Sequence, residues 1–581
     1  MRKLAAALFH GCRAGLLDTV VAMLEAGVSS NTEDPEGVSP LMVAAARHGH
    51  HSIIQLLFTW ESSVHYLGGP LGNTALHEAA SQGFLECCRL LVGAGADVNV
   101  RNAQEDTALI LAAHSGNIQV VRHLLSHGAS VRYRGHHDRT ALHVAAENGH
   151  VNCCKLFIMA EADIEADDAF GHTPLISAAE KGFVEPTRVL LTQGADVNNV
   201  CHSAATALHF ASQHGNTECC KLLLNSGAEI DAQDIRRYTP LMMASMNGHS
   251  DTVSLLVEFK SNVNMAAYNR RTALHLAAER GKLTCSSLLL EADSQIDAQD
   301  SNLCTPVHLA ASRGHADVLQ FLIESGSDLN RTTTNGNSLL HMAATGGNVH
   351  CCKMVIGKGF GLDIQNNDGD TPLIAAVSNK QSQVVQFLLE SGCDVNARGQ
   401  HGMTALNEAV FHHYGSCQIV KLLLDNGADP DIPDDVNTSP LWFAVDSGNP
   451  QVIKLLLQSN ADLGQRSSLS ESCGPCNALE HSAHKQNRAV LEALVRIYNQ
   501  SAVNMMKTLH SSPQLLSPQY SPLVRDLVHS VAFSTSLLTD MCRESIRKSL
   551  GKGGQINQKI QELTLPKSLL KFLLLEDLDV E

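Results

Sequence analysis

The sequence has few aromatic residues and too little positive charge for a protein that binds nucleic acid. Phe, Trp and Tyr together make up only 4% of the 581 residues, so Leu, Ala and Val must do most of the packing. The formal net charge is −17, whereas a nucleic-acid binder needs a basic face to neutralise phosphates. We therefore expect cores of small aliphatic side chains and no nucleic-acid partner.

Disulfide-scaffold, membrane-spanning and catalytic signatures are also missing. The 17 cysteines are too sparse in so long a chain for a disulfide framework. No apolar segment is long enough to span a bilayer, and the N-terminal run MRKLAAALFHGC falls in register with the repeat described next rather than forming a secretion signal. No P-loop, nucleophile elbow, HExxH or kinase motif is present. The expectation is a non-enzymatic protein of the cytoplasm or nucleus, with no cofactor and no membrane contact.

A repeat fills most of the chain. From Thr74 to Thr404 a Thr or Ser, then a small residue or Pro and an apolar residue, recurs every 33 residues without a slip. Irregular copies precede and follow it, at 6–27 and 477–499, which makes about fifteen units. A period of this length indicates a stack of supersecondary units, each burying its apolar face on its neighbours.

One unit, residues 72–100, predicts two short helices. Thr74 suits a helix N-cap, and several other units place Pro directly after the Thr, where its missing N–H costs least. Gly83 ends the first helix and Gly95 the second. We expect the buried stripe of the second helix to comprise Leu85, Cys88, Leu90 and Leu91.

The unit resembles the ankyrin repeat in its length and in its motifs, TPLHxAAxxGH followed by GADVN. The resemblance covers roughly residues 4–499. It implies an all-α fold, an ankyrin-repeat solenoid of about 15 repeats, occupying residues 1–499.

Histidine and paired cysteines recur with a period of 66. Alternate units carry His four residues into the motif, and most of these also carry a cysteine pair: His77, His143, His209, His275 and His341, with Cys87–Cys88, Cys153–Cys154, Cys219–Cys220 and Cys351–Cys352. Metal binding is the alternative to packing here. We favour packing, because neighbouring residues on a helix point about 100° apart and chelate one ion poorly.

The stretch SCGPCNALEHSAH, residues 472–484, offers a second chemical signal. Cys473 and Cys476 match a redox dithiol, and with His481 and His484 they could be drawn as a zinc set. A thioredoxin-like site needs a βαβ setting, and the histidine spacing is unusual for zinc. We interpret the stretch as a loop before the last repeat, with no metal.

Basic and aromatic residues gather at three of the turns that enter the repeats. Since these turns project along one edge of the stack, we expect a surface that binds an acidic segment of a protein substrate; scattered solvated residues are the alternative. Its predicted residues are Arg132, Arg134, Arg139, Arg236, Arg237, Tyr238, Tyr268, Arg270 and Arg271.

A family resemblance also concerns modification. Leu-x5-Asp-Val-Asn in ankyrin turns is similar to sites hydroxylated by the factor-inhibiting asparaginyl hydroxylase. The asparagines that fit are Asn99, Asn198 and Asn396, and Asn330 fits with Leu in place of Val.

The repeat ends near residue 499, and a connector rich in Ser, Pro and Gln fills 500–535. Residues 536–577 then show short apolar-faced helices, too small to form a core alone. The first of these helices resembles the half of a SOCS box that engages Elongin C, which has the form Leu-x3-Cys-x3-[Ala/Ile]. The matching positions are Leu538, Cys542 and Ile546, with Met541 and Leu550 beside them.

The rest of the tail resembles the second half of the box, which directs cullin-5 binding. The matching positions are Leu565, Pro566, Leu569 and Phe572. Two residues depart from the pattern, Leu537 before the key leucine and Thr564 in place of a proline.

An ankyrin array followed by a SOCS box is the order of the ankyrin repeat and SOCS box family. Membership implies a substrate-recognition subunit of a ubiquitin ligase that contains Elongin B/C, cullin-5 and a RING subunit. One alternative is a non-catalytic scaffold whose tail caps the array. An enzyme based on the CGPC dithiol is the other.

Overall fold

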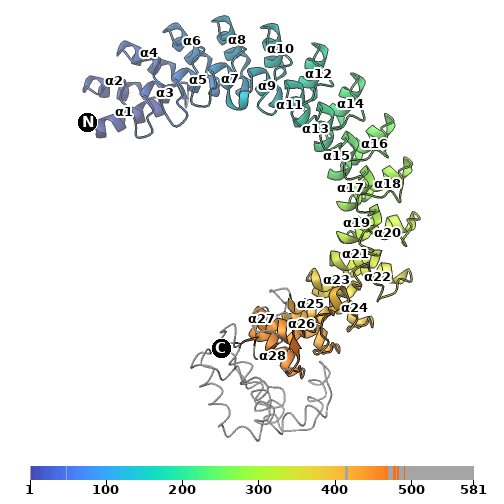
Figure 1. Ribbon diagram of the computed structural model, residues 1–581. Helices are drawn as coiled ribbons and strands as arrows, with labels where there is room; N and C mark the ends of the chain where they lie inside the picture. Colours follow the sequence, from blue (N-terminus) through green and yellow to red (C-terminus); the bar gives the residue numbers. More distant parts are fainter. Residues whose placement is uncertain are drawn as a thin grey trace, which may run out of the picture. The chain divides into compact units, whose positions relative to one another are not determined.

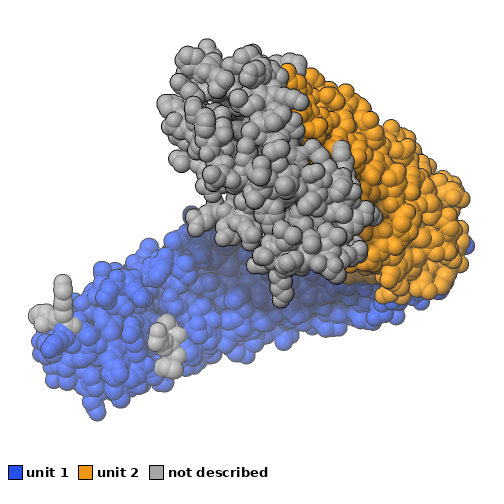
Figure 2. Space-filling model, turned by 90° about the horizontal axis from the view of Figure 1, so that it is seen from below, with its two compact units in different colours: residues 1–277, 284–295 blue, residues 278–283, 296–581 orange. Residues whose placement is uncertain are grey.

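The structure is a computed structural model that describes residues 2–46, 49–411, 417–462, 464–468, 476–478, 481–482 and 490. It divides into two compact units (Figure 2). Unit 1 is residues 1–277 and 284–295, and unit 2 is residues 278–283 and 296–581. Each unit is a stack of short helix pairs, so the predicted all-α repeat fold is confirmed (Figure 1).

The helices of unit 1 come in regularly spaced pairs. They are α1 (Arg2–Ala14), α2 (Leu17–Glu25), α3 (Pro40–Ala46), α4 (His51–Thr59), α5 (Ala75–Gln82), α6 (Leu85–Gly93), α7 (Ala108–Ser115), α8 (Ile118–Ser126), α9 (Ala141–Glu147), α10 (Val151–Met159), α11 (Pro174–Lys181), α12 (Val184–Thr192), α13 (Ala207–His214), α14 (Thr217–Asn225), α15 (Pro240–Asn247) and α16 (Ser250–Glu258). A short 3-10 helix, η1 (His136–Asp138), lies in the turn before α9.

The division between the units falls at α17 (Ala273–Glu279) and α18 (Leu283–Glu291). The elements of unit 2 are α19 (Pro306–Ser312), α20 (Ala316–Glu324), α21 (Leu339–Gly346), α22 (Val349–Gly357), α23 (Pro372–Ser378), α24 (Ser382–Glu390), η2 (Gln400–Gly402), α25 (Ala405–Phe411), α26 (Cys417–Asp425), α27 (Pro440–Ser447), α28 (Pro450–Gln458), β1 (Arg466–Ser467) and β2 (Cys476–Asn477). The last two pair antiparallel. The predicted final repeat, 477–499, falls almost entirely outside the described residues.

The start and stop of each first helix follow from its local sequence. In α5 the Thr74 hydroxyl accepts a hydrogen bond from the His77 N–H at 3.3 Å, and His77 Nδ1 accepts one from the Thr74 N–H at 3.1 Å. This reciprocal pair satisfies two N–H groups that a helix start leaves free. Gly83 then takes φ of 81°, which favours glycine, and stops the helix. The predicted Thr74 cap and Gly83 stop are confirmed, whereas α6 ends at Gly93 with Ala94 as its cap, and Gly95, with φ of 90°, follows that cap.

Second helices differ slightly from the prediction. In α6, Cys88 and Leu91 are buried as expected, but Leu85 and Leu90 are only half-buried, and Cys87 is buried instead. A second helix lies between the second helices of both neighbouring repeats, and α6 packs on α4 and on α8. Its buried face is therefore wider than one stripe, and a small thiol fits the added contact.

Within unit 1 the first helices, α3 to α15, pack successively to form one layer, and the second helices, α4 to α16, form the other (Figure 1). Ala79 and Ala80, both 0% exposed, let neighbouring first helices approach closely. This stacking brings the turns before successive first helices side by side. No helix in the described part of the chain is long and apolar enough to cross a membrane.

Candidate functional site: the tip strip of unit 1

Five consecutive turns of unit 1 form a continuous strip, here called the tip strip: 134–139, 167–172, 200–205, 234–238 and 267–271. Backbone hydrogen bonds join each turn to the next. The N–H groups of Ala169, His202, Ile235 and Tyr268 donate to the carbonyls of His137, Phe170, Ser203 and Arg236 at 2.9, 3.1, 3.0 and 3.2 Å. The turns that carry the predicted substrate-binding residues thus belong to one connected edge.

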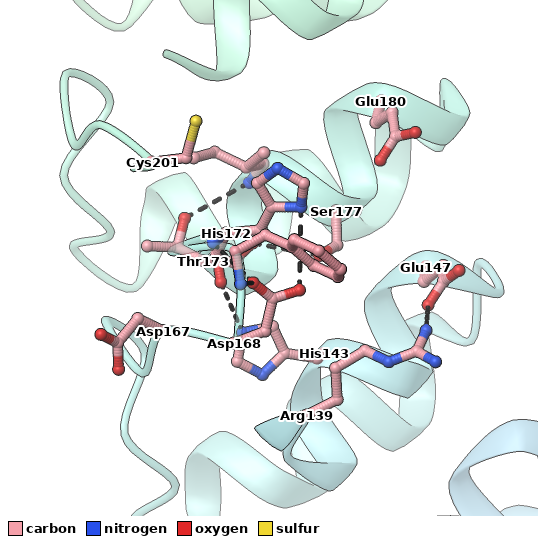
Figure 3. Close-up of polar contacts among 12 residues, drawn as sticks. Arg139, His143, Glu147, Asp167, Asp168, His172, Thr173, Ser177, Glu180 and Cys201 are labelled. Carbon is pink, nitrogen blue, oxygen red and sulfur yellow. Dashed lines mark hydrogen bonds and ion pairs between the residues drawn. The ribbon is translucent and has the colours of Figure 1, made fainter. Parts of the chain in front are cut away.

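Arginines near the first turn are mostly engaged within the protein. Arg134 Nη2 lies 3.0 Å from Asp167 Oδ1 in the next turn, and its Nη1 donates to the Asp167 carbonyl. Arg139 Nη1 lies 2.6 Å from Glu147 Oε2, and both side chains are half-buried (Figure 3). Arg132 is exposed. Because Asp167 and Glu147 balance two of the guanidinium charges, this end of the strip is less positive than its sequence suggests.

Arginine and tyrosine stack at the other end of the strip. The Arg236 guanidinium carbon lies 5.0 Å from the centre of the Tyr238 ring, and that of Arg237 lies 4.9 Å from the centre of the Tyr268 ring. The second contact joins neighbouring repeats. Tyr268 is 70% exposed, so this cation–π pair presents a flat, positively charged surface to solvent.

Two arginines occupy a backbone conformation that favours glycine. Arg237 and Arg270 both have φ of 60°, and the same turn position holds Gly171, Gly336 and Gly369 in some repeats but Glu105, Ala204 and Leu303, with φ of 65°, 58° and 57°, in others. A β-carbon in this left-handed region costs about 1 kcal/mol or more. Since several repeats bear this cost with other side chains, the backbone strain does not by itself single out the two arginines.

Apolar residues of the strip were missed by the sequence analysis. Phe170 and Ile235 are 54% and 59% exposed, and the His137 and Phe170 ring centres lie 5.6 Å apart. They stand at or beside the turn position that Arg236 holds. Aligning the turns by the period of 33 could have found them. Together with Tyr268 they give the strip apolar contacts beside its positive charge.

The recurring histidines hold the strip on its helices. His143 and His209 bond the Thr before their own helix, and their Nε2 atoms lie 2.9 Å from the His172 carbonyl and 3.0 Å from the Tyr238 carbonyl of the next turn. Burial lowers the pKa of both imidazoles, and the bonded carbonyls partly oppose this shift. They are neutral structural groups at neutral pH.

The cysteine pairs are buried thiols, as expected for packing residues. Cys153 and Cys154 are 1% and 0% exposed, and burial raises the pKa of their thiols to about 11 and about 12. The other three pairs are buried in the same way. Among the described residues, no group of three or more His, Cys, Asp or Glu side chains could hold a metal ion.

The predicted hydroxylation asparagines bridge neighbouring repeats. Asn99 Nδ2 donates to the Gly128 carbonyl at 3.1 Å, and its Oδ1 accepts from the Ser130 N–H at 2.9 Å. Asn198 and Asn396 bond the next repeat through the same two atoms. So does Asn264, which was not predicted because Asn262 replaces the motif aspartate. For Asn330 the N–H donates to Asp328 Oδ1 at 3.1 Å.

The residues predicted to bind Elongin C and cullin-5 lie outside the described part of the chain, as do Cys473 and His484. Of the possible zinc set, Cys476 lies in β2, and His481 is described with its side-chain contacts. Its ring stacks on Trp442 with centres 4.2 Å apart, and its Nε2 lies 2.8 Å from Asp446 Oδ1. That nitrogen is thus already used by a carboxylate.

Comparison with protein families places two modules on the chain. The model for ankyrin repeats (3 copies) matches overlapping segments that together run from residue 8 to 300 and from 307 to 506. The SOCS box model matches residues 536–574. The two modules therefore occur in the order that the sequence motifs indicated.

Individual relatives match over short stretches. A probable E3 ubiquitin-protein ligase, XBOS33 of Oryza sativa subsp. japonica, is 40% identical over 78 residues, which are 13% of this chain and 15% of that protein. The tyrosine-protein kinase HTK16 of Hydra vulgaris is 33% identical over 102 residues, 17% of this chain and 13% of that protein. The ankyrin repeat domain of human ASB11 matches at 26% identity and a TM-score of 0.36, over 38% of this chain and 99% of that domain.

Proposed function

Because the chain belongs to the ankyrin repeat and SOCS box family, we propose that it is the substrate-recognition subunit of a ubiquitin ligase. The remaining subunits would be Elongin B/C, cullin-5 and a RING protein. The observation that carries the proposal is the SOCS box at 536–574 behind an ankyrin array that fills most of the chain. The array would bind the substrate while the box binds the ligase.

The first half of the box would bind Elongin C. Leu538, Cys542 and Ile546 recur every four residues, so on a helix they share one face. Met541 and Leu550 flank that face. An apolar stripe of this kind suits insertion into a partner's groove.

Cullin-5 would be selected by the second half of the box, through Leu565, Pro566, Leu569 and Phe572. Thr564 stands where the family pattern has a proline. Proline fixes the backbone angle φ near −65°, and threonine does not. Restoring the proline, Thr564→Pro, should therefore strengthen cullin-5 capture without changing Elongin capture.

Substrate would bind at the tip strip. The stacked Arg237–Tyr268 pair and the neighbouring Arg236 and Arg270 supply positive charge and flat aromatic surface, which suit an acidic segment with an exposed side chain. Phe170 adds apolar contact.

The subunit itself would be non-catalytic and would act in the cytoplasm or the nucleus. The recurring histidines are occupied by helix caps, and the paired thiols are buried with raised pKa values, so neither set is arranged as a nucleophile and base. Ubiquitin transfer would be carried out by the partners.

Proximity labelling in cells tests the proposal in a two-by-two design. The full chain is compared with the box variant Leu538→Asp with Cys542→Asp, each with and without Arg237→Gly and Arg270→Gly. Substrates should accumulate near the box variant, because they are no longer degraded, and should be lost from both tip variants. If the box variant changes the abundance of no neighbour, the scaffold alternative is favoured. If the same neighbours accumulate near the box variant with and without the two arginine substitutions, only the placement of the substrate site is wrong.

A further inference from the structure

Two arginine–tyrosine stacks stand on neighbouring turns of the tip strip. Within the turn 234–238 the Arg236 guanidinium lies over the Tyr238 ring, and the Arg237 guanidinium reaches the Tyr268 ring in the turn 267–271. The preceding turn, 200–205, contains no arginine, lysine or tyrosine. These two turns therefore carry a paired, positively charged aromatic surface that the turn before them lacks.

Both stacked guanidinium groups keep donors that the described residues do not use. Arg236 Nε lies 3.7 Å from Asp234 Oδ2, which is beyond hydrogen-bond length, and Asp234 Oδ1 already accepts from the Arg236 and Tyr238 N–H groups at 2.8 and 2.7 Å. Within the described part of the chain, the Arg237 guanidinium contacts the Tyr268 ring and no carboxylate. Both arginines are exposed, so each presents a fork of N–H donors to a carboxylate from outside.

The stacking of the repeats sets the distance between the two forks. Packed helices lie about 8–10 Å apart, so equivalent points of neighbouring turns are separated by about the same distance. In a polyproline II segment three residues complete one turn and advance about 9 Å, so residues i and i+3 share one face at this spacing. A β-strand alternates its faces and would point residues i and i+3 in opposite directions. The two forks therefore fit two acidic residues that stand three apart in an extended segment.

Phe170 offers an apolar contact further along the same strip. It is 54% exposed, and its ring centre lies 5.6 Å from that of His137 and 6.0 Å from that of His172. Its turn, 167–172, stands two repeats before the turn that carries Arg236. Two repeats correspond to about six residues of a polyproline II segment. An apolar side chain six residues from the nearer acidic residue would therefore reach the Phe170 ring.

We propose that the tip strip recognises an extended segment of a partner protein by a pair of acidic residues three apart, with an apolar residue six positions from the nearer one. The Arg236 and Arg237 forks each take one carboxylate, and the tyrosine rings hold the two guanidinium planes in place. Two forks on separate turns suit two carboxylates better than one phosphate group. The inference rests on the substrate site proposed above, but not on the ligase subunits.

The test measures how the spacing of two aspartates changes the affinity of a synthetic peptide for the purified full chain. Each fluorescent peptide is a Gly/Ser chain with one leucine and two aspartates, the nearer one six residues from the leucine, and is made with the leucine first and with the leucine last. The aspartates are placed at i and i+2, i+3, i+4 or i+7, and a further peptide has asparagine at i and i+3. Fluorescence anisotropy gives the dissociation constants.

In one of the two orientations the i, i+3 peptide should bind about fivefold more tightly than the other spacings, because a misplaced carboxylate loses one exposed ion pair. Arg237→Gly should abolish this advantage, and its turn should persist because a φ of 60° favours glycine. Arg132→Gln is the control of equal charge. Arg132 is exposed and lies three repeats away, where salt screens its charge, so the substitution should change affinity by less than about twofold.

Four results would overturn the proposal: no measurable binding of the i, i+3 peptide, equal affinity at all spacings, a preference for i, i+7 as in a helical partner, or tighter binding of a peptide with one phosphoserine in place of the pair. Equal losses in Arg237→Gly and Arg132→Gln would also overturn it, because net charge alone would then explain binding. Capture of Elongin B/C on the same protein separates the two proposals. Capture without a spacing preference removes only the acidic-pair inference, and a spacing preference without capture removes only the ligase role.

Discussion

Replacing His209 by leucine tests how the tip strip is held on its helices. His209 is 1% exposed, its Nδ1 accepts from the Thr206 N–H at 3.1 Å, and its Nε2 lies 3.0 Å from the Tyr238 carbonyl. Nδ1 accepts, so Nε2 carries the hydrogen and donates. Leucine keeps much of the volume but leaves the Thr206 N–H without this acceptor, while the Tyr238 carbonyl loses one of its two donors and keeps the Asp234 N–H at 3.0 Å.

The expected loss follows from those two groups. A buried polar group that loses its partner costs about 1–3 kcal/mol, and water that reaches the turn will recover part of this. We therefore expect His209→Leu to lower the local opening free energy by about 3 kcal/mol, an increase of roughly 100-fold in exchange rate. His209→Gln should lose less, because glutamine at this position can still complete a capping box.

Hydrogen exchange of peptides covering 206–209 and 234–239, read by mass spectrometry, measures this loss. Ile176→Leu is the matched control, because Ile176 holds the same helix position in the preceding repeat, where its N–H donates to Thr173 Oγ1. That apolar exchange should change protection by less than about 1.5 kcal/mol. If His209→Leu exchanges no faster than Ile176→Leu, the imidazole does not hold the turn.

The remaining predictions concern pH, the tip strip, the paired thiols and the asparagines. Burial lowers the pKa of His209 in the folded state, so the unfolded state binds more protons below pH 6.5; the melting temperature should fall as pH drops from 6.5 to 5, and less steeply in His209→Leu. Arg237→Gly should leave the melting temperature nearly unchanged, because relief of about 1–2 kcal/mol of left-handed strain offsets about 0.5–1 for glycine entropy and a similar stacking loss; a drop of more than 5 °C contradicts this. Cys154→Ser should destabilise the array by about 1–3 kcal/mol in chemical denaturation, since it buries a hydroxyl among apolar groups. An unchanged denaturation midpoint would mean that water reaches the hydroxyl at this position. Intact-peptide mass spectrometry of protein from cells should find one added oxygen on these asparagines, and its absence from all of them would remove the hydroxylation hypothesis: Asn99, Asn198, Asn330 and Asn396.

Sequence predicted best what depends on a few neighbouring residues. The Thr74 cap and the Gly83 stop involve contacts three to four residues apart. The same residue types recur in other repeats, so local sequence was sufficient to predict these helix ends. The buried face of α6 was predicted less well because it depends on helices of both neighbouring repeats. A single-stripe pattern underestimates burial in a stack.

The candidate site was harder to predict from sequence, because it depends on contacts between neighbouring turns. Arg134 was predicted to face a partner but is held by Asp167, which is 33 residues away and one turn along the strip.

The central claim is tested most directly by capture of Elongin B/C on the purified full chain. Wild-type protein should bind the Elongin B/C dimer stoichiometrically, and Leu538→Asp with Cys542→Asp should abolish binding, because two charges would enter the apolar face. Glu544→Gln, off that face, is the matched control and should bind as wild type does. Undiminished capture by the double variant, or no capture by the wild type, would contradict the assignment of this protein as a ligase subunit.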